Sequence, residues 1–268
     1  MLKCILVTLL VAGSTAAADA TIIYSNDFSA SATGFTGANA IQTAPDGTTF
    51  LGFFAEGSGT SRSLILSGIG THTSVTLSFD LYALLSLHGD GTHESGQAGG
   101  DWFLVTANSS TVLLNDTFAS DAFSRRENSA PYQSYGGPGL HGIGPGGVGL
   151  YPAATGSYSY DDTAFGYCYS DVSNGCGAGR ENTYKFSFTF NDSASSIIFG
   201  FTGNTNNGWP DEAFGIDNVV VTTAGPETAS VPEPSTLALF GFGLLALAWL
   251  SGRARGTSSL RPLPLSNS

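Results

Sequence analysis

One short run in the chain alternates strictly between polar and aromatic side chains. Residues 185–190 read Lys-Phe-Ser-Phe-Thr-Phe. Successive side chains of a β-strand point to opposite faces, so this period of two predicts a strand with one aromatic, buried face. Between residues 21 and 224 no segment shows a sustained period of 3.6 with helix caps. We therefore expect an all-β domain of about 200 residues, large enough for one sandwich core.

Further segments rich in β-branched and aromatic residues are separated by clusters of Gly, Asn, Asp and Ser, which are typical of turns. Glycine supplies 36 of the 268 residues, nearly twice the usual share of ~7%. The predicted fold is an antiparallel β-sandwich, either jelly-roll (concanavalin-like) or carbohydrate-binding-module-like. The predicted strands are Thr21–Phe28, Thr48–Ala55, Ser63–Leu66, Ser74–Leu87, Trp102–Ala107, Thr111–Leu114, Thr183–Phe190, Ser196–Phe201 and Phe214–Thr223.

The segment from Arg125 to Tyr160 differs from the rest of this region. It is rich in Gly, Pro and Tyr and shows little alternation. Long connections of this kind are usually functional or disordered. We interpret it as a surface excursion between strands and not as a second domain.

The first 20 residues resemble a signal peptide. Lys3 supplies a minimal positive region, residues 5–12 are apolar, and Ala18-Asp19-Ala20 fits the A-x-A cleavage pattern. Cleavage after Ala18 and cleavage after Ala20 both fit. The protein is therefore expected to be exported.

The acidity of the chain limits its partners. Residues 21–230 hold five basic and 19 acidic side chains, which leaves a net charge of −14. Such a surface repels nucleic acid and attracts cations. We expect no nucleic-acid partner.

The predicted exported domain contains two cysteines, Cys168 and Cys176. An isolated pair eight residues apart in an exported protein favours a disulfide over free thiols. Two cysteines with no histidine nearby make a poor zinc site.

Two aspartates near the ends of the domain are candidate calcium ligands. Asp27 lies near the end of the first predicted strand, and Asp217 lies in the last one, within Gly-Ile-Asp-Asn-Val. Ca²⁺ takes six to eight oxygen ligands, so neighbouring first and last strands can supply both carboxylates to one structural ion. The alternative is that Asp217 and Asn218 only face solvent.

A polar loop before a tryptophan is a candidate sugar site. Asp90 lies in this loop, and Asp101 leads directly into Trp102, while Trp209 lies in a second polar segment. Sugars stack on flat aromatic rings and hydrogen-bond to acids and amides. The alternative is that both tryptophans belong to the core. His88 and His93 in the same loop give a weak metal signal, and a solvated turn is the more common reading.

Catalytic motifs are missing from the sequence. Walker A, G-x-S-x-G, H-E-x-x-H and the E-x-D-x-x-E pattern of laminarinase-type glycosidases are all absent. Residues 144–149 satisfy G-x-G-x-x-G formally, but no helix pattern follows. Asp211 and Glu212 are adjacent, so on a strand they would point to opposite faces. We therefore expect a non-enzymatic protein.

The C-terminal region divides into three parts. Residues 225–235 form a linker, 236–252 a predicted transmembrane sorting helix, and 253–268 a basic cytoplasmic tail. The uncharged run Thr236–Leu250 would be about 22 Å long as a helix. A stable span needs about 20 residues, so this run is short for a permanent anchor.

The motif Val231-Pro232-Glu233-Pro234, followed by the apolar run and by Arg253 and Arg255, resembles the PEP-CTERM sorting signal of Gram-negative bacteria. That signal is also catalogued as an ice-binding-protein C-terminal domain. The resemblance implies processing by an exosortase near Pro-Glu-Pro, transient residence in the inner membrane, and release to the cell surface or an exopolysaccharide matrix. The family usually ends after the basic residues, whereas this chain continues through Gly256–Ser268.

The body of the chain is similar to β-sandwich ectodomains that often precede this signal, through Phe79–Tyr82, Asp101–Phe103, Asn115–Phe118 and the closing Gly-Ile-Asp-Asn-Val strand. No enzymatic activity follows from that likeness. Our leading hypothesis is a non-enzymatic surface or matrix protein that binds polysaccharide and calcium. The alternatives are a glycan-active hydrolase of concanavalin-like fold and a purely structural matrix or adhesion protein.

Overall fold

The computed structural model contains two compact units, one spanning Asp19–Pro226 and the other Met1–Ala18 with Glu227–Ser268. It describes residues 20–37, 40–56, 61–89, 100–120, 132–141, 151–161, 165–167, 181–226, 241 and 243–244. The predicted signal peptide and nearly all of the predicted sorting helix lie outside these residues. Within the described part of the chain, no helix is both long and apolar enough to cross a membrane.

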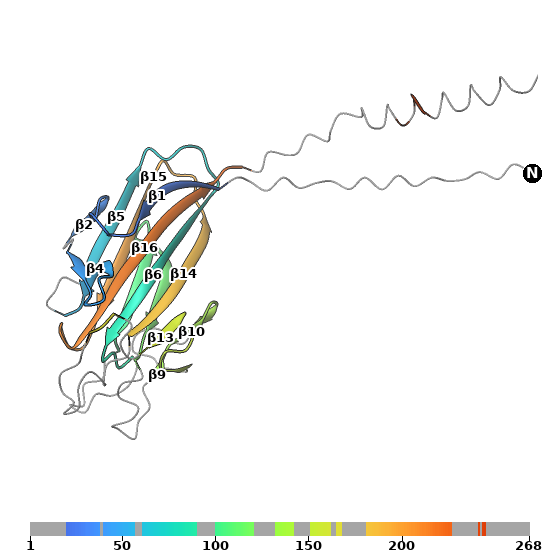
Figure 1. The fold of residues 1–268 in the computed structure, drawn as a ribbon. Coiled ribbons are helices and arrows are strands. Elements are labelled where there is room, and N and C mark those ends of the chain that lie inside the picture. The colour runs from blue at the N-terminus through green and yellow to red at the C-terminus, as the bar shows by residue number, and fades with distance from the viewer. Residues whose placement is uncertain are drawn as a thin grey trace, which may run out of the picture. The chain divides into compact units, whose positions relative to one another are not determined.

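The domain is built from two antiparallel sheets (Figure 1). In the large sheet the strand order is β13-β14-β6-β16-β4-β3, and β1 also pairs with β16; in the small sheet it is β2-β5-β15-β7-β8. The large sheet comprises β1 (Ala20–Asn26), β3 (Ile41–Thr43), β4 (Thr49–Phe54), β6 (Ser74–Leu85), β13 (Ser159–Asp161), β14 (Glu181–Asn191) and β16 (Glu212–Ala224). The small sheet comprises β2 (Phe35–Gly37), β5 (Ser61–Ser67), β7 (Trp102–Ala107), β8 (Thr111–Thr117) and β15 (Ser196–Asn204).

All nine predicted strands are confirmed, with ends that differ by a few residues. The sequence missed the three remaining strands of the two sheets, β2, β3 and β13. Each has only three residues, too few to show a period. Two further ribbons pair β10 (Tyr135–Gly137) with β11 (Leu140–His141) and β12 (Tyr151–Pro152) with β9 (Tyr132–Gln133). The all-β fold with two antiparallel sheets is thus confirmed, while the jelly-roll type and the C-terminal helix stay predictions.

Aromatic side chains from both sheets meet in the core. Phe79 of β6 contacts Phe201 of β15, with ring centroids 5.5 Å apart. Phe103 of β7 contacts Phe54 of β4 at 5.2 Å and Phe214 of β16 at 5.4 Å. These edge-to-face and tilted pairs join the two layers, because each pair takes one ring from each sheet.

The predicted surface excursion is wrong for part of the segment between residues 125 and 160. Tyr135 is 2% exposed, and its ring lies 5.4 Å from that of Phe118 and 5.2 Å from that of Phe186. Gln133 is fully buried beside it. The sequence hides this packing because a single tyrosine in a Gly-rich stretch fills the space between β8 and β14 without any periodic pattern.

The first and last strands of the domain are neighbours. β1 pairs with β16 from Ala20 opposite Ala224 to Asn26 opposite Val219. The predicted adjacency of the first and last strands is therefore confirmed, and both ends of the folded domain lie side by side.

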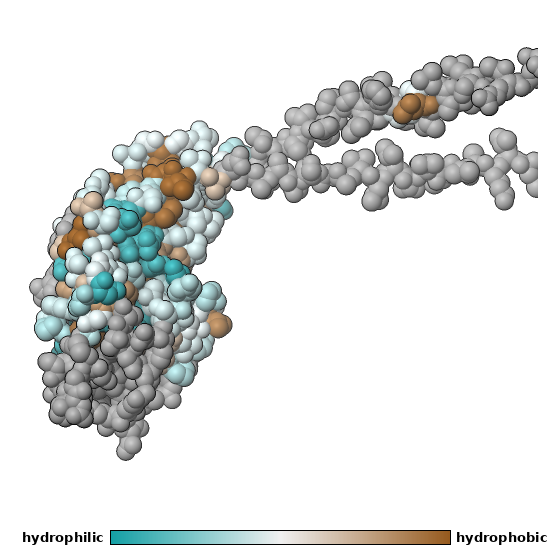
Figure 2. All heavy atoms as spheres, viewed as in Figure 1, coloured by the Kyte–Doolittle hydropathy of each residue, from teal (hydrophilic) through white to brown (hydrophobic). Residues whose placement is uncertain are grey.

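Some large apolar side chains remain on the surface. Figure 2 shows apolar atoms beside polar ones on one face of the domain. Ile65 of β5 lies directly opposite Ile198 of β15, and the two are 46% and 40% exposed. The outer face of the small sheet therefore presents aliphatic side chains to solvent.

Candidate functional site

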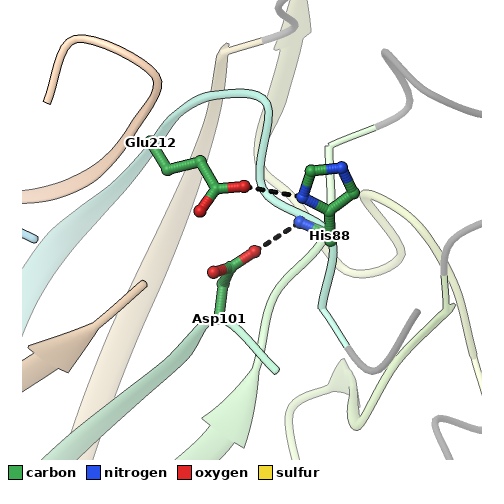
Figure 3. A group of neighbouring side chains, drawn as sticks. All are labelled: His88, Asp101 and Glu212. Carbon is green, nitrogen blue, oxygen red and sulfur yellow. Dashed lines mark hydrogen bonds and ion pairs between the residues drawn. The ribbon is translucent and has the colours of Figure 1, made fainter. Parts of the chain in front are cut away.

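A histidine and two carboxyl groups meet at one end of the sandwich (Figure 3). His88 follows β6, Asp101 directly precedes β7, and Glu212 is the first residue of β16. Because β6 and β16 belong to the large sheet and β7 to the small sheet, the cluster connects the two layers.

Backbone pairing brings these residues together. Glu212 lies opposite Leu85 in the register of β16 and β6. Beyond Leu85 the chain leaves the large sheet, and His88 forms an isolated bridge with Ala119, just after β8 of the small sheet. The crossing is held by a 2.8 Å hydrogen bond that the Ser120 N–H donates to the Leu87 carbonyl.

The three side chains are almost completely shielded from solvent, with exposures of 4% for His88 and 0% for Asp101 and Glu212. His88 Nδ1 lies 2.6 Å from Glu212 Oε1, and the His88 backbone N–H donates to Asp101 Oδ2. The two carboxyl groups face each other in Figure 3. One ligand atom from each of the three residues lies within 4.8 Å of the other two.

The outer sides of both carboxyl groups are held by the turn before β16. The Asn206 N–H donates to Asp101 Oδ1 at 2.9 Å, and the Asn207 N–H donates to Glu212 Oε2 at 3.0 Å. The cluster therefore fixes the turn between β15 and β16 as well as the start of β7.

Burial dominates the electrostatics of the cluster. It raises the pKa of Asp101 well above its usual range, and the neighbouring Glu212 carboxyl raises it further. Burial also raises the pKa of Glu212 to about 7, although hydrogen bonds from the Asn207 backbone and from Asp101 act in the opposite direction. Two neighbouring buried carboxyl groups cannot both stay ionised unless a cation binds to them or one of them takes up a proton. The site can therefore hold either a shared proton or a metal ion.

The structure places the residues of the predicted sugar site in different surroundings. Asp101 is part of the buried cluster, and the expectation of a solvated turn is wrong for His88, because the chain crosses between the sheets there. Trp102 is partly buried on β7, where the burial pattern puts it on the outward side of the small sheet. Asp90 and His93 lie outside the described residues.

Trp209 belongs to an aromatic group on the large-sheet side. Its ring stacks on Phe53 of β4, with centroids 3.8 Å apart and planes 11° apart. Tyr167 packs edge-on against Trp209 at 5.0 Å and lies 6.2 Å from Phe53. All three rings are partly buried. Phe53, Tyr167 and Trp209 are called the aromatic cluster below; Trp102 is not part of it.

The predicted calcium ligands lie near the junction of β1 and β16. Asp27 is exposed, and its Oδ1 accepts hydrogen bonds from the backbone and hydroxyl of Ser29. Asp217 is buried and accepts a 2.8 Å hydrogen bond from the Tyr82 hydroxyl. Burial raises the pKa of Asp217 to about 6, with smaller contributions from Asp80 and Asp27.

A hollow of about 500 Å³ lies beside β14. Its walls include Tyr135, Phe186 and Phe188, and Lys185 is the charged residue among those that line it. Of its three aromatic residues only Phe188 is partly exposed, and the hollow contains none of the predicted site residues.

The predicted disulfide between Cys168 and Cys176 lies outside the described residues, as do Val231, Pro232, Glu233, Pro234, Arg253 and Arg255 of the sorting motif. No curated protein and no solved structure matches the chain. Residues 230–254 match the family model of the PEP-CTERM protein-sorting motif, which confirms the resemblance of the tail. The chain therefore carries a PEP-CTERM sorting motif, and this motif marks it as an exported surface protein that an exosortase sorts.

Proposed function

We propose that this exported protein acts at the cell surface or in an exopolysaccharide matrix, where its sandwich domain binds polysaccharide without turning it over. The observation that carries the proposal is the aromatic cluster. Its three rings come from β4, from residues 165–167 and from the turn before β16, and none is fully buried. A partly exposed stacked tryptophan is the side chain on which a pyranose ring packs best.

The Tyr167 hydroxyl and the exposed carboxylate of Asp46 lie at the cluster and can hydrogen-bond to sugar hydroxyls, whereas Glu181 is fully buried. Burial raises the pKa of Tyr167 to about 12, with smaller contributions from the nearby charges of Glu181 and Asp46. The Tyr167 hydroxyl is therefore protonated at neutral pH and can donate. Asp46 and Glu56 are exposed, and the Glu56 carbonyl lies against Gly208, next to Trp209.

The segment that carries Tyr167 is held in place before any ligand arrives. Glu181 Oε2 accepts a 2.6 Å hydrogen bond from the Phe165 N–H, and Oε1 accepts a 3.1 Å bond from the Tyr167 N–H. Preorganisation of this kind lowers the entropy cost of binding.

The burial of Asp101 and Glu212 supports binding over hydrolysis. A glycosidase needs two carboxyl groups that reach the scissile bond from an open cleft. Both carboxyl groups of this pair have 0% exposure, so a polymer cannot contact them. A structural Ca²⁺ bound by Asp27 and Asp217 belongs to the same proposal, supported by the pairing of β1 with β16.

We expect Trp209→Ala to weaken binding of the purified protein to exopolysaccharide or to an arrayed glycan by roughly 10- to 30-fold, since a tryptophan at the centre of a binding site contributes about 2 kcal/mol. Tyr158→Ala is the matched control, because Tyr158 is 73% exposed and lies outside the cluster. Binding would be measured by calorimetry on glycans that the wild type retains.

Three results would contradict this proposal. If glycan binding were unchanged in Trp209→Ala but lost in Phe188→Ala, the sugar site would be the hollow beside β14. Release of new reducing ends by the wild type would establish a hydrolase. A wild type that retains no glycan would favour the purely structural role.

Processing at the sorting motif gives a separate prediction. The mature surface protein should end between about residues 231 and 235, because the Pro-Glu-Pro sequence lies there. Intact-mass spectrometry of protein recovered from the cell surface measures this directly. A mature protein that still ends at Ser268 would show instead that the apolar run is retained as an anchor.

A further inference from the structure

We propose that His88, Asp101 and Glu212 bind one divalent transition-metal ion, with Zn²⁺ the best match, and that this ion ties the two sheets together beside the aromatic cluster. The inference does not rest on sugar binding. It rests on the position, burial and contacts of these three side chains.

The three side chains lie close enough together to coordinate one ion. Three potential ligand atoms from three separate chain segments lie within 4.8 Å of one another. Zinc–ligand bonds of ~2.1 Å in a tetrahedral site place ligand atoms about 3.4 Å apart. Side-chain adjustments of roughly 1 Å therefore bring all three atoms into coordination. In Figure 3 the two carboxyl groups lie next to each other, and the Nδ1 side of the imidazole points toward Glu212.

The charge of the two carboxyl groups favours a bound cation. Within the described part of the chain, neither Asp101 nor Glu212 forms an ion pair with a lysine or arginine. The side-chain partners of the two carboxyl groups there are His88 and each other. Buried carboxylates are usually paired or bound to a metal, and a divalent ion would neutralise both groups at once.

Backbone hydrogen bonds set the orientation of both carboxyl groups. Backbone N–H groups of His88, Asn206 and Asn207 occupy outward lone pairs of the carboxyl oxygens. Such second-layer hydrogen bonds fix the direction of metal-binding carboxylates. They hold the two groups toward each other, although the like charges would otherwise drive them apart.

The donor set selects the metal. One imidazole and two carboxylates suit Zn²⁺, which commonly takes three protein ligands in an open site. Ca²⁺ prefers six to eight oxygen ligands, and an imidazole nitrogen does not belong to that set. A bound ion would connect the start of β7 and the start of β16, and it would hold the turn that leads to Trp209.

The test measures metal content and thermal unfolding of the purified full-length chain. After dialysis into metal-free buffer, the protein would be titrated with Zn²⁺, Mn²⁺, Ca²⁺ and Mg²⁺. We expect close to one equivalent of Zn²⁺ by mass spectrometry of the metal. We also expect the midpoint temperature to rise by about 5–10 °C at a hundredfold excess over the dissociation constant, and chelation should reverse the rise.

The variants Glu212→Gln and Asp101→Asn should each weaken Zn²⁺ binding by at least 100-fold and remove the shift. His72→Gln is the matched control, because His72 also lies beside a carboxylate, 3.2 Å from Asp192, but the residues that the structure describes add no third ligand to this pair. That variant should bind Zn²⁺ as the wild type does. If both carboxyl variants fail to fold, X-ray absorption spectroscopy of the zinc-loaded wild type tests the proposal instead. The spectrum should show one imidazole among the zinc ligands, and a ligand shell without imidazole would contradict the site.

Two results would overturn the inference. A wild type that binds none of the four ions would mean that the carboxyl pair holds a proton instead. Stabilisation by Ca²⁺ alone, lost in Asp217→Asn but kept in Glu212→Gln, would place the ion at the end of β1.

Discussion

Replacing Gln133 with alanine should lower the free energy of unfolding by on the order of 4 kcal/mol, because several buried groups lose their partners at once. Gln133 is fully buried. Its Oε1 accepts hydrogen bonds from the N–H groups of Ala119 and Ala154, each at 3.1 Å, and from the Tyr184 hydroxyl at 3.2 Å. The Ala154 N–H keeps a second acceptor, the Ala119 carbonyl at 3.1 Å, but the Ala119 N–H and the Tyr184 hydroxyl lose theirs. Each donor left without a partner inside the protein costs roughly 1–3 kcal/mol.

The amide nitrogen of Gln133 makes the remaining bonds. Nε2 donates to the carbonyls of Tyr135 at 2.6 Å and Thr155 at 2.9 Å. Gln133→Glu should therefore also destabilise the domain, because a carboxylate oxygen would then face these two carbonyl oxygens. The pair of variants separates loss of the whole side chain from loss of the donor alone.

Urea denaturation followed by tryptophan fluorescence measures the loss. Gln42→Ala is the matched control, because the Gln42 amide is partly buried and donates one bond, to the Gly52 carbonyl at 3.2 Å. It should cost about 1 kcal/mol. Equal losses in the Gln133 and Gln42 variants would show that the buried network does not hold the segment around β9 to the sandwich.

The long strands were predictable from the sequence, and the contacts of Gln133 were not. A strand of seven or more residues repeats its inward positions often enough to reveal the period of two, as in Tyr184, Phe186 and Phe188 of β14. Gln133 lies in a strand of two residues. A two-residue strand gives no sequence pattern that distinguishes a buried, multiply hydrogen-bonded glutamine from one in an exposed turn. The hydrogen-bond partners of Gln133 lie up to 51 positions away in the sequence.

The candidate site was only partly predictable for the same reason. The position of Asp101 before Trp102 marks it as a candidate, but the sequence does not select Glu212, because neighbouring acids on a strand point to opposite faces. In the structure only Glu212 is on the strand: it begins β16 and lies in the buried cluster, while Asp211 lies in the turn before β16, where its Oδ1 accepts a hydrogen bond from the Ser86 hydroxyl. His88 and Glu212 are 124 positions apart, so only the pairing of β6 with β16 shows that they meet. The available signal was that each of the three lies at the end of a predicted strand.

Phe103→Ala should cost about 3–5 kcal/mol, the usual range for removing a fully buried phenylalanine. Phe103 has 0% exposure and projects from β7 between Phe54 and Phe214 of the large sheet. Gly203 of β15 leaves the room for it, because a Cβ added there would lie 3.2 Å from the Phe103 ring and 2.6 Å from Phe54. The neighbouring side chains pack closely around the Phe103 ring. They cannot fill the cavity that Phe103→Ala would leave unless one of the two sheets moves.

The adjacent residue supplies the control. Leu104 is partly buried on the opposite side of β7, so Leu104→Ala should cost about 1 kcal/mol, because less apolar area is lost and no closed cavity forms. Phe103→Leu should fall between the two. If Leu104→Ala were as costly as Phe103→Ala, the outer face of the small sheet would have to be covered by another part of the protein. The core would then not be confined to the space between the two sheets, and the start of β7, which carries Asp101, would be anchored from both sides.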